Sequence, residues 1–268
     1  MKEIKAIVIG AAGKMGSRII HLIHETPSIS LYRAVERPDH PSIGKDIGEV
    51  IGLGKMGIPL EGDLKKTGGD VIINFTNPKT SLESLEFAKE TGSAIVIGTT
   101  GLSPEQMERV RDLSKSVRCV FTPNMSVGMN VMFRIVKEVA RVLGPEYDIE
   151  IFEAHHRLKK DSPSGTAVKL GELIAKAVGR EFGKVGVYGR KGMVGERTKE
   201  EIRMQVIRAG DIVGEHTVLF GGIGERLEII HRAHSRDNFA RGAIRAALWV
   251  VNQPNGLYDM QDVLGLKG

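Results

Sequence analysis

The sequence contains a single cysteine, Cys119, among its 268 residues. One cysteine cannot form a disulfide within the chain, so a disulfide-stapled secreted scaffold is excluded and a reducing compartment is expected. Cys119 lies in the apolar run CVF, which favours a small core residue over a nucleophile. No apolar run reaches the ~18 residues of a membrane span, and the first residues show no signal-peptide pattern. We therefore expect a cytoplasmic protein without a membrane partner.

Patterns typical of metal and nucleic-acid binding are also missing. The chain has no CxxC and no HExxH motif, and adjacent histidines such as His155 and His156 would point to opposite faces of a strand, where they could not easily hold one ion. The net charge is +5, but the lysines and arginines form no tail or continuous stripe. This distribution fits an anionic small-molecule ligand at least as well as nucleic acid. We expect no bound metal and no nucleic-acid partner.

Glycine, by contrast, is abundant, with 33 residues and no repeat period, which indicates many tight turns. In the first half, short apolar runs alternate with amphipathic segments that have helical spacing. The expected strands are Lys5–Gly10, Ser30–Val35, Val71–Phe75, Ala94–Gly98 and Arg118–Thr122. The expected helices are Lys14–Glu25, Thr80–Thr91, which Gly92 would end, and one that begins after Ser103, where Gln106 would complete a capping box. This alternation predicts an α/β fold, a Rossmann-like doubly wound parallel sheet covered by helices on both faces.

The pattern changes after about residue 127. Longer segments with alternating polarity predict antiparallel or mixed strands with one solvated face. They are Asp148–Glu153, Ile202–Arg208, His216–Phe220 and Glu225–His231, with a helix at Ala167–Val178 and a final helix near Asp237–Val251. We therefore predict a dinucleotide-binding domain over residues 1–126, completed by 237–268. Residues 127–236 are predicted to form an α+β domain for substrate binding and oligomerisation.

A glycine-rich turn, GAAGKMG, lies between the first expected strand and the first expected helix. Its spacing is GxxGxxG, and Ala12 occupies the position where the second glycine of GxGxxG often lies. Glu36 follows Gly16 by 20 residues, at the end of the second strand, where an acid binds the adenosine ribose. These residues could form only a tight turn and a solvated Glu-Arg pair, but their order favours a dinucleotide site. The candidate residues are Gly10, Ala11, Ala12, Gly13, Lys14, Met15, Glu36 and Arg37.

Two further loops follow later strands of the expected sheet. In an open α/β sheet, ligands bind outside the carboxyl ends of the strands, so both loops could reach the nicotinamide end of a dinucleotide. Ordinary loop chemistry would explain either loop alone. The candidate residues are Gly98, Thr99 and Thr100 in the first loop and Thr122, Pro123, Asn124 and Met125 in the second.

The stretch EAHHRLKKDSPSGTA, which begins at Glu153, combines proton-transferring and anion-binding groups. Histidine titrates near neutral pH, and lysine can donate a proton or hold a carboxylate. We expect Ser162 to cap the following helix with Pro163 at its first position. The main-chain N–H groups of the next residues would then form an anion cradle, although a plain capped helix explains this run about equally well.

These motifs occur in one order along the chain: GAAGKMG, the pair Glu36-Arg37, GTTG at Gly98, NMSVGMNV at Asn124 and EAHHRLKKDSPSGTA at Glu153. Together they closely resemble the 4-hydroxy-tetrahydrodipicolinate reductase family of the diaminopimelate route to lysine. The resemblance covers essentially the whole chain, and the last string is highly specific. Leu158 stands where some members carry another histidine, and this difference removes none of the roles below.

The resemblance implies NAD(P)H-dependent reduction of a cyclic dicarboxylate to tetrahydrodipicolinate with release of water, in a homotetramer. It implies His155 as proton donor and acceptor and Lys159 as proton donor. The substrate carboxylates would bind His156, Ser164, Gly165 and Thr166. The turn Gly10–Met15, Glu36, Arg37 and both later loops would bind the cofactor. The presence of both Glu36 and Arg37 suggests that NADH and NADPH are both used.

Two other functional classes compete with this interpretation. Another two-domain Rossmann oxidoreductase acting on an amino-acid-derived substrate would not need the His-His-Arg-x-Lys string before the SPSGT run. A non-catalytic dinucleotide-binding regulator would predict a degraded acid–base set. His155 and Lys159 are both present, and no helix rich in base-reading residues stands out.

Overall fold

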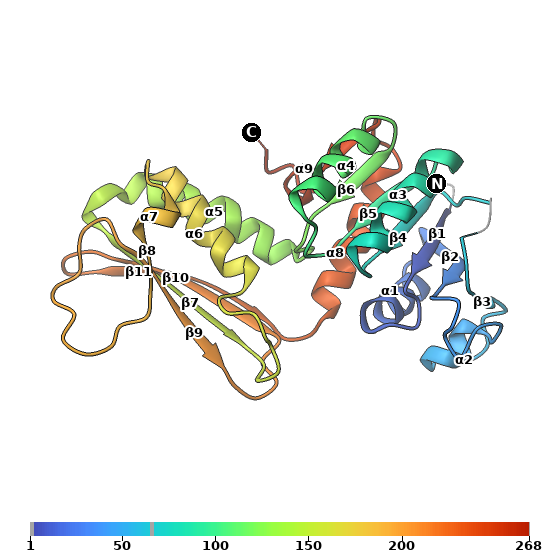
Figure 1. Cartoon of the computed structure of the whole chain (residues 1–268), viewed down its shortest axis with the longest axis horizontal. Helices are drawn as coiled ribbons and strands as arrows, with labels where there is room; N and C mark the ends of the chain where they lie inside the picture. Colours follow the sequence, from blue (N-terminus) through green and yellow to red (C-terminus); the bar gives the residue numbers. More distant parts are fainter. Residues whose placement is uncertain (1–2, 65–66, 268) are drawn as a thin grey trace. The chain divides into compact units, whose positions relative to one another are not determined.

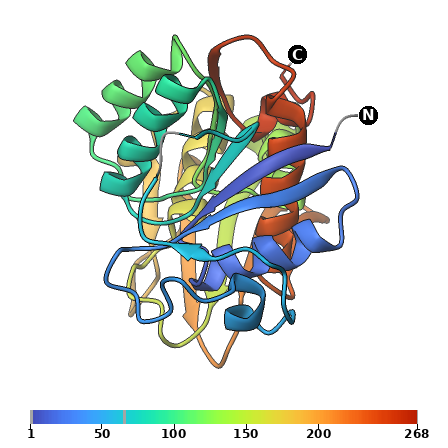
Figure 2. The same cartoon turned by 90° about the vertical axis from the view of Figure 1, so that its right-hand side faces the viewer.

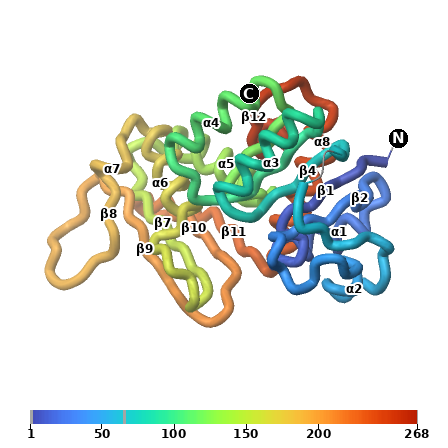
Figure 3. The backbone as a smooth tube through the Cα atoms, turned by 45° about the vertical axis from the view of Figure 1, so that its right-hand side comes forward, coloured from blue at the N-terminus to red at the C-terminus, as the bar shows by residue number. Residues whose placement is uncertain are grey.

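The computed structural model describes residues 3–64 and 67–267. The chain divides into two compact units: Met1–Val127 with Arg236–Gly268, and Gly128–Ser235. The tube in Figure 3 follows the chain through the first unit, into the second at α5 and back into the first at α8. Within the described residues, no helix is both long and apolar enough to cross a membrane.

The first unit is built on a parallel sheet of seven strands (Figure 1). The strand order is β12-β6-β5-β4-β1-β2-β3. The chain adds β2 and β3 on one side of β1 and the later strands on the other side, so the strand order reverses between the parallel neighbours β1 and β4. This order confirms the predicted Rossmann-like fold. The strands are β1 (Ile4–Ile9), β2 (Ile29–Val35), β3 (Leu60–Glu61), β4 (Val71–Asn74), β5 (Ala94–Ile97), β6 (Arg118–Phe121) and β12 (Gly256–Tyr258).

Helices cover both faces of this sheet, as the near-continuous apolar strands predict. Figure 2 shows α3 and α4, in green, on one side of the strands and α1 (blue) and α8 (red) on the other. Successive residues of β1 enter opposite cores: Ile7 joins the α3–α4 side and Val8 the α1–α8 side. The helices are α1 (Lys14–His24), α2 (Ile47–Ile51), α3 (Pro78–Thr91), α4 (Pro104–Ser114), α8 (Asp237–Val250) and α9 (Met260–Val263).

Several local predictions for this unit are confirmed. Ser103 caps α4 in a capping box with Gln106, and Gly92 ends α3 in the left-handed conformation. Cys119 is fully buried, and burial raises the pKa of its thiol to about 12. The thiol is therefore a core group and not a nucleophile.

The second unit is a mixed sheet of five strands in the order β11-β10-β7-β9-β8. Strand β10 pairs antiparallel with β7 and β11, whereas β9 runs parallel to both β7 and β8. Residues from α5 and α6 form one core with one face of the sheet. The elements are α5 (Val127–Leu143), the 3-10 helix η1 (Gly144–Glu146), β7 (Asp148–His155), α6 (Gly165–Ala177), α7 (Phe182–Val185), β8 (Gly186–Tyr188), β9 (Ile202–Arg208), β10 (Gly214–Gly221) and β11 (Arg226–Ala233).

The predicted start of α6 is wrong. The helix begins at Gly165, and Ser164, not Ser162, is its cap, because the Ser164 side chain accepts a hydrogen bond from the Ala167 N–H at 3.2 Å. Pro163 therefore lies before the helix and not at its first position. The two serines are equally good caps in sequence, and the choice depends on a tertiary contact that holds the Ser164 main chain.

Candidate functional site

The glycine-rich turn connects β1 to α1 at the carboxyl edge of the parallel sheet. The N–H groups of Gly10 and Ala11 donate to the Val35 carbonyl oxygen at 2.8 and 3.1 Å, which joins the turn to the end of β2. Gly10 has a φ of 72°, and a Cβ at Gly16 would lie 2.0 Å from the Gly10 carbonyl oxygen. The helix thus approaches the turn at a distance that only glycine permits, which directs its first N–H groups toward the edge.

Glu36 lies beside this turn, as the sequence predicts. Its carboxylate accepts hydrogen bonds from the Ala12 N–H at 3.2 Å and from the Arg37 N–H at 3.1 Å. Arg37 extends into solvent with 65% of its side chain exposed and an ion pair of 3.4 Å to Asp39. A cavity of about 560 Å³ opens here, lined by residues that include Gly10, Glu36, Arg37, Asp63, Thr76 and Thr80. Thr76, which follows β4, has no motif in the sequence that would have identified it.

The two later loops lie at the same edge of the sheet, after β5 and β6. The Thr122 N–H donates to the Ile97 carbonyl oxygen at 3.1 Å, and the buried Thr99 hydroxyl accepts a hydrogen bond from Ser81 at 2.7 Å. The Met125 side chain is buried in the core, so any ligand contact of this residue would come from its main chain. The unit therefore brings all of the predicted cofactor residues to one edge.

The second unit centres its polar groups on Glu153, in β7. The Glu153 side chain is completely buried and lies 2.5 Å from His155 Nδ1. Arg208, in the neighbouring strand β9, donates to both carboxylate oxygens at 2.9 and 2.8 Å. The Ser164 N–H donates to the same carboxylate at 2.9 Å. One carboxylate thus joins β7, β9 and the start of α6.

These contacts fix the charges of the cluster. Burial alone raises the pKa of Glu153, but the hydrogen bonds from His155, Arg208 and Ser164 outweigh it and lower this pKa to about 2. The ring of His216, in β10, stands edge-on to that of His155 with 5.3 Å between centroids. Burial and then the proximity of His155 lower the pKa of His216 to about 3. At neutral pH the cluster therefore contains an anionic glutamate, a cationic arginine and a neutral His216.

The other predicted residues of the second unit lie on the segment that follows β7 and at the start of α6. His216 Nε2 lies 3.3 Å from the hydroxyl of Ser164. Ser164 directly precedes Gly165 and Thr166, which begin α6. His156 follows β7, and its buried Nδ1 has no hydrogen-bond partner within the described part of the chain. Lys159 donates to both carboxylate oxygens of Asp161 at 2.8 Å. The second unit therefore brings the residues predicted to bind anions and to transfer protons onto neighbouring segments.

Three residues of this cluster received no role from the sequence. Glu153 could have been found, because residues i and i+2 of a strand share a face, and Glu153 precedes His155 by two positions. Arg208 lies 55 residues from Glu153 and His216 lies 52 residues from Ser164. No local pattern signals either one, since strand pairing alone brings them to the site.

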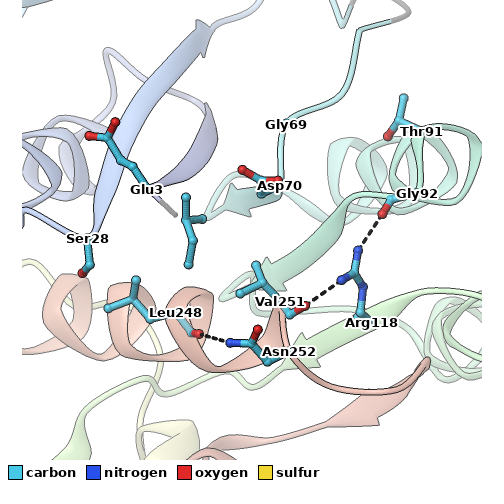
Figure 4. Close-up of a pocket in the computed structure, with 11 residues that line it drawn as sticks. Glu3, Ser28, Gly69, Asp70, Thr91, Gly92, Arg118, Leu248, Val251 and Asn252 are labelled. Atoms are coloured by element: carbon cyan, nitrogen blue, oxygen red, sulfur yellow. Dashed lines mark hydrogen bonds between the residues drawn. The ribbon is translucent and has the colours of Figure 1, made fainter. Parts of the chain in front are cut away.

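A second cavity of the first unit, of about 700 Å³, lies at the opposite, amino edge of the sheet. Figure 4 shows Arg118 directed toward the main-chain carbonyl groups that end two helices. Its guanidinium donates to the carbonyl oxygens of Gly92, after α3, and Val251, after α8, each at 2.7 Å. Arg118 thereby satisfies carbonyl groups that a helix end leaves without partners.

Within residues 3–64 and 67–267, no group of three or more histidine, cysteine, aspartate or glutamate side chains could hold an ion. The basic and hydroxyl groups near Glu153 instead suit an anionic organic ligand.

Comparison with known proteins assigns both units to one kind of enzyme. Residues 4–125 match the model "Dihydrodipicolinate reductase, N-terminus", and residues 128–264 match "Dihydrodipicolinate reductase, C-terminus". The chain is 60% identical over 266 residues to a 4-hydroxy-tetrahydrodipicolinate reductase of Syntrophus aciditrophicus, covering 98% of this chain and 99% of the relative. A relative with the same name from Geotalea uraniireducens is 54% identical, covering 98% and 100%.

Solved structures show the same architecture. A dipicolinate-bound dihydrodipicolinate reductase from Paenisporosarcina sp. TG-14 is similar with a TM-score of 0.74 and 24% identity, covering 97% of this chain and 98% of that one. An amine dehydrogenase from Mycobacterium smegmatis gives a TM-score of 0.59 and 14% identity, with coverages of 96% and 94%. Because enzymes with different names share this fold, the fold alone does not identify the substrate.

Proposed function

The chain belongs to the dihydrodipicolinate reductase family, and from this premise we propose that it reduces 4-hydroxy-tetrahydrodipicolinate to tetrahydrodipicolinate with a nicotinamide cofactor. This step belongs to the synthesis of diaminopimelate and lysine, and the expected compartment is the cytoplasm. The observation that carries the proposal is the buried Glu153 cluster. In this cluster the Glu153 carboxylate contacts both a histidine and the start of α6, which suits an anion. This arrangement fits a dicarboxylate substrate that must also exchange a proton.

We assign the cofactor to the carboxyl edge of the first unit, where it would supply a hydride. The first N–H groups of α1 and the close approach at Gly16 suit a pyrophosphate. Glu36 suits the hydroxyl groups of the adenosine ribose, and Arg37 suits a 2′-phosphate. Arg37 is exposed and its side chain pairs with exposed Asp39 among the described residues, so it can turn toward a 2′-phosphate when one is present. We therefore propose that both NADH and NADPH are used.

The substrate roles fall to the second unit. His156, Ser164, Gly165 and Thr166 hold the carboxylates, because the start of α6 offers N–H groups and hydroxyls to an anion. His155 exchanges a proton, and Lys159 donates one as the ring is reduced. The Lys159 ammonium group donates to both carboxylate oxygens of Asp161, so this salt bridge must open before the lysine can reach a substrate.

A coupled assay with freshly generated substrate, followed through oxidation of NADH or NADPH, tests the activity. Wild-type protein is expected to turn over with both cofactors, and silence with both would reject the proposal. Lys159→Ala is expected to lower kcat by about 100-fold or more, within the range typical of a lost general acid, while NADH affinity stays within about 2-fold. Loss of NADH binding with catalysis intact would contradict the role of Lys159.

We propose further that the second unit forms the contacts of a homotetramer through the face of its sheet that no helix of that unit covers. Phe152 and Ile230 lie in one row across this face, on either side of Thr217. Phe152 is 37% exposed and Ile230 is 45% exposed. Ile207 is 50% exposed on the same face. An apolar face of this kind is typical of a buried interface. A single monomeric mass in light scattering at micromolar concentration would contradict this proposal.

A further inference from the structure

The Glu153 carboxylate is saturated by donors. One of its oxygens accepts from His155 Nδ1 and from one Arg208 nitrogen, and the other accepts from Ser164 N–H and from the second Arg208 nitrogen. All four distances lie between 2.5 and 2.9 Å, and the Glu153 side chain is fully buried. A buried group with this many ionic and main-chain partners has one orientation available to it.

The geometry decides which ring nitrogen of His155 carries the proton. An anionic carboxylate only accepts hydrogen bonds, so Nδ1 must donate and the neutral ring must hold its proton there. Nε2 is then left with its lone pair, and it has no hydrogen-bond partner among the described residues. Gly214 makes room for this nitrogen, since a Cβ at that position would lie 3.1 Å from Nε2. The ring thus presents a single basic atom in a fixed direction.

We propose that Glu153 is a positioning residue for the reaction, which holds His155 in the Nδ1–H tautomer with Nε2 as the nitrogen that exchanges the substrate proton. Arg208 anchors Glu153 from β9, and the Ser164 N–H ties the same carboxylate to the carboxylate-binding start of α6. This role rests on the proposed function, because it acts through the proton transfer assigned to His155. A carboxylate that orients a histidine without touching substrate is a recurring arrangement in acid–base catalysis.

The charged and titratable neighbours support this assignment. Arg208 offers only donors, so it cannot replace Glu153 as the acceptor for Nδ1. The neutral His216 ring contacts the His155 ring edge-on, so it supplies no anionic acceptor for His155. His231, which pairs with His216 across β10 and β11, has a pKa lowered by burial. Within the described residues, Glu153 is therefore the only anion in hydrogen-bond contact with the His155 ring.

The first test needs no activity. Protein labelled with ¹⁵N at histidine, at a pH where the rings are neutral, reports in its ring ¹⁵N shifts which nitrogen of His155 is protonated; the signals are assigned by their loss in His155→Gln. The expected result is a proton on Nδ1. A proton on Nε2 in the wild-type protein would overturn the proposal. This measurement can be made even if every Glu153 variant fails to fold.

The second test is a double-mutant cycle. Glu153→Gln keeps the shape of the side chain but removes its charge, and it is expected to lower kcat by about 100-fold. This loss lies between that typical of removing a residue that orients a metal ligand and that of replacing the aspartate of a Ser-His-Asp triad. In a His155→Gln background the same change is expected to cost less than about 3-fold, because the residue through which Glu153 acts is already absent. Equal losses in both backgrounds, or no loss in either, would overturn the proposal.

A matched control comes from the first unit, where Asp237 holds Arg18 through two hydrogen bonds of 2.8 and 2.7 Å with no histidine between them. Asp237→Asn is expected to leave kcat within about 2-fold, because this pair is partly exposed and neither residue has a role in the proposed reaction. Inactive wild-type protein, or full activity of His155→Gln, would defeat the proposed function. The ¹⁵N measurement would still decide the tautomer of His155.

Discussion

The two edges of the seven-stranded sheet are both hollowed, but they differ in the chemistry of the helix ends that meet there. The carboxyl edge has the smaller cavity, about 560 Å³, and receives the N-terminus of α1 beside Glu36. The amino edge has the larger cavity, about 700 Å³, and receives the C-termini of α3 and α8. Helix N-termini attract anions, whereas helix C-termini repel them. Helix direction, and not cavity size, therefore favours the carboxyl edge for the proposed dinucleotide.

Of the three changes that test this comparison of the edges, Gly16→Ala at the carboxyl edge is expected to have the largest effect. A Cβ at this position would lie 2.0 Å from a main-chain oxygen, so the turn must move away from α1. We expect NADH affinity to fall by about 100-fold or more, because the pyrophosphate contacts depend on that approach. Fluorescence titration with NADH measures the change, with circular dichroism to confirm folding. An affinity within about 3-fold of wild type would place the cofactor elsewhere.

Arg37→Ala is expected to give an intermediate and selective effect at the same edge. The side chain is 65% exposed, so its contact with a 2′-phosphate is partly screened by solvent. NADPH should bind about 10-fold more weakly, equivalent to about 1.4 kcal/mol, while NADH binding stays unchanged. Titration with the two cofactors in parallel measures the ratio. Equal losses for both would exclude the pairing of Arg37 with the 2′-phosphate.

Arg118→Met should have the smallest effect, and only on stability. The change removes two hydrogen bonds of 2.7 Å to helix-end carbonyl groups at the amino edge. We expect the free energy of unfolding to fall by about 1–2 kcal/mol, with NADH affinity unchanged. Urea denaturation and the NADH titration check the two parts. Weakened NADH binding in a folded variant would show that the two edges are not independent.

Much of the first unit was predictable because its signals are local. The capping box at Ser103 and the left-handed Gly92 depend on neighbouring residues, and the structure confirms both. The cap of α6 was predicted at Ser162, and this was wrong. Ser162 and Ser164 are chemically alike, and the hydrogen bond from the Ser164 N–H to Glu153 favours the second.

The strand pairings of the second unit were the least predictable part. Alternating polarity indicates that Ile202–Arg208 is a strand, but it does not reveal that β9 runs parallel to β7 and places Arg208 opposite His155. The short strands β8 and β12 also have no clear pattern. Their three residues each carry too few side chains to show a period, and pairing with a neighbour defines them.

By itself, the sequence determined the parallel sheet, the glycine-rich turn and the family, because each depends on residues that are close together or on strings specific enough to stand alone. Only the tertiary structure decided that Glu153 joins His155, Arg208 and the start of α6. The reason is physical: a buried carboxylate needs several donors, and donors from three separate segments meet only when the sheet has paired.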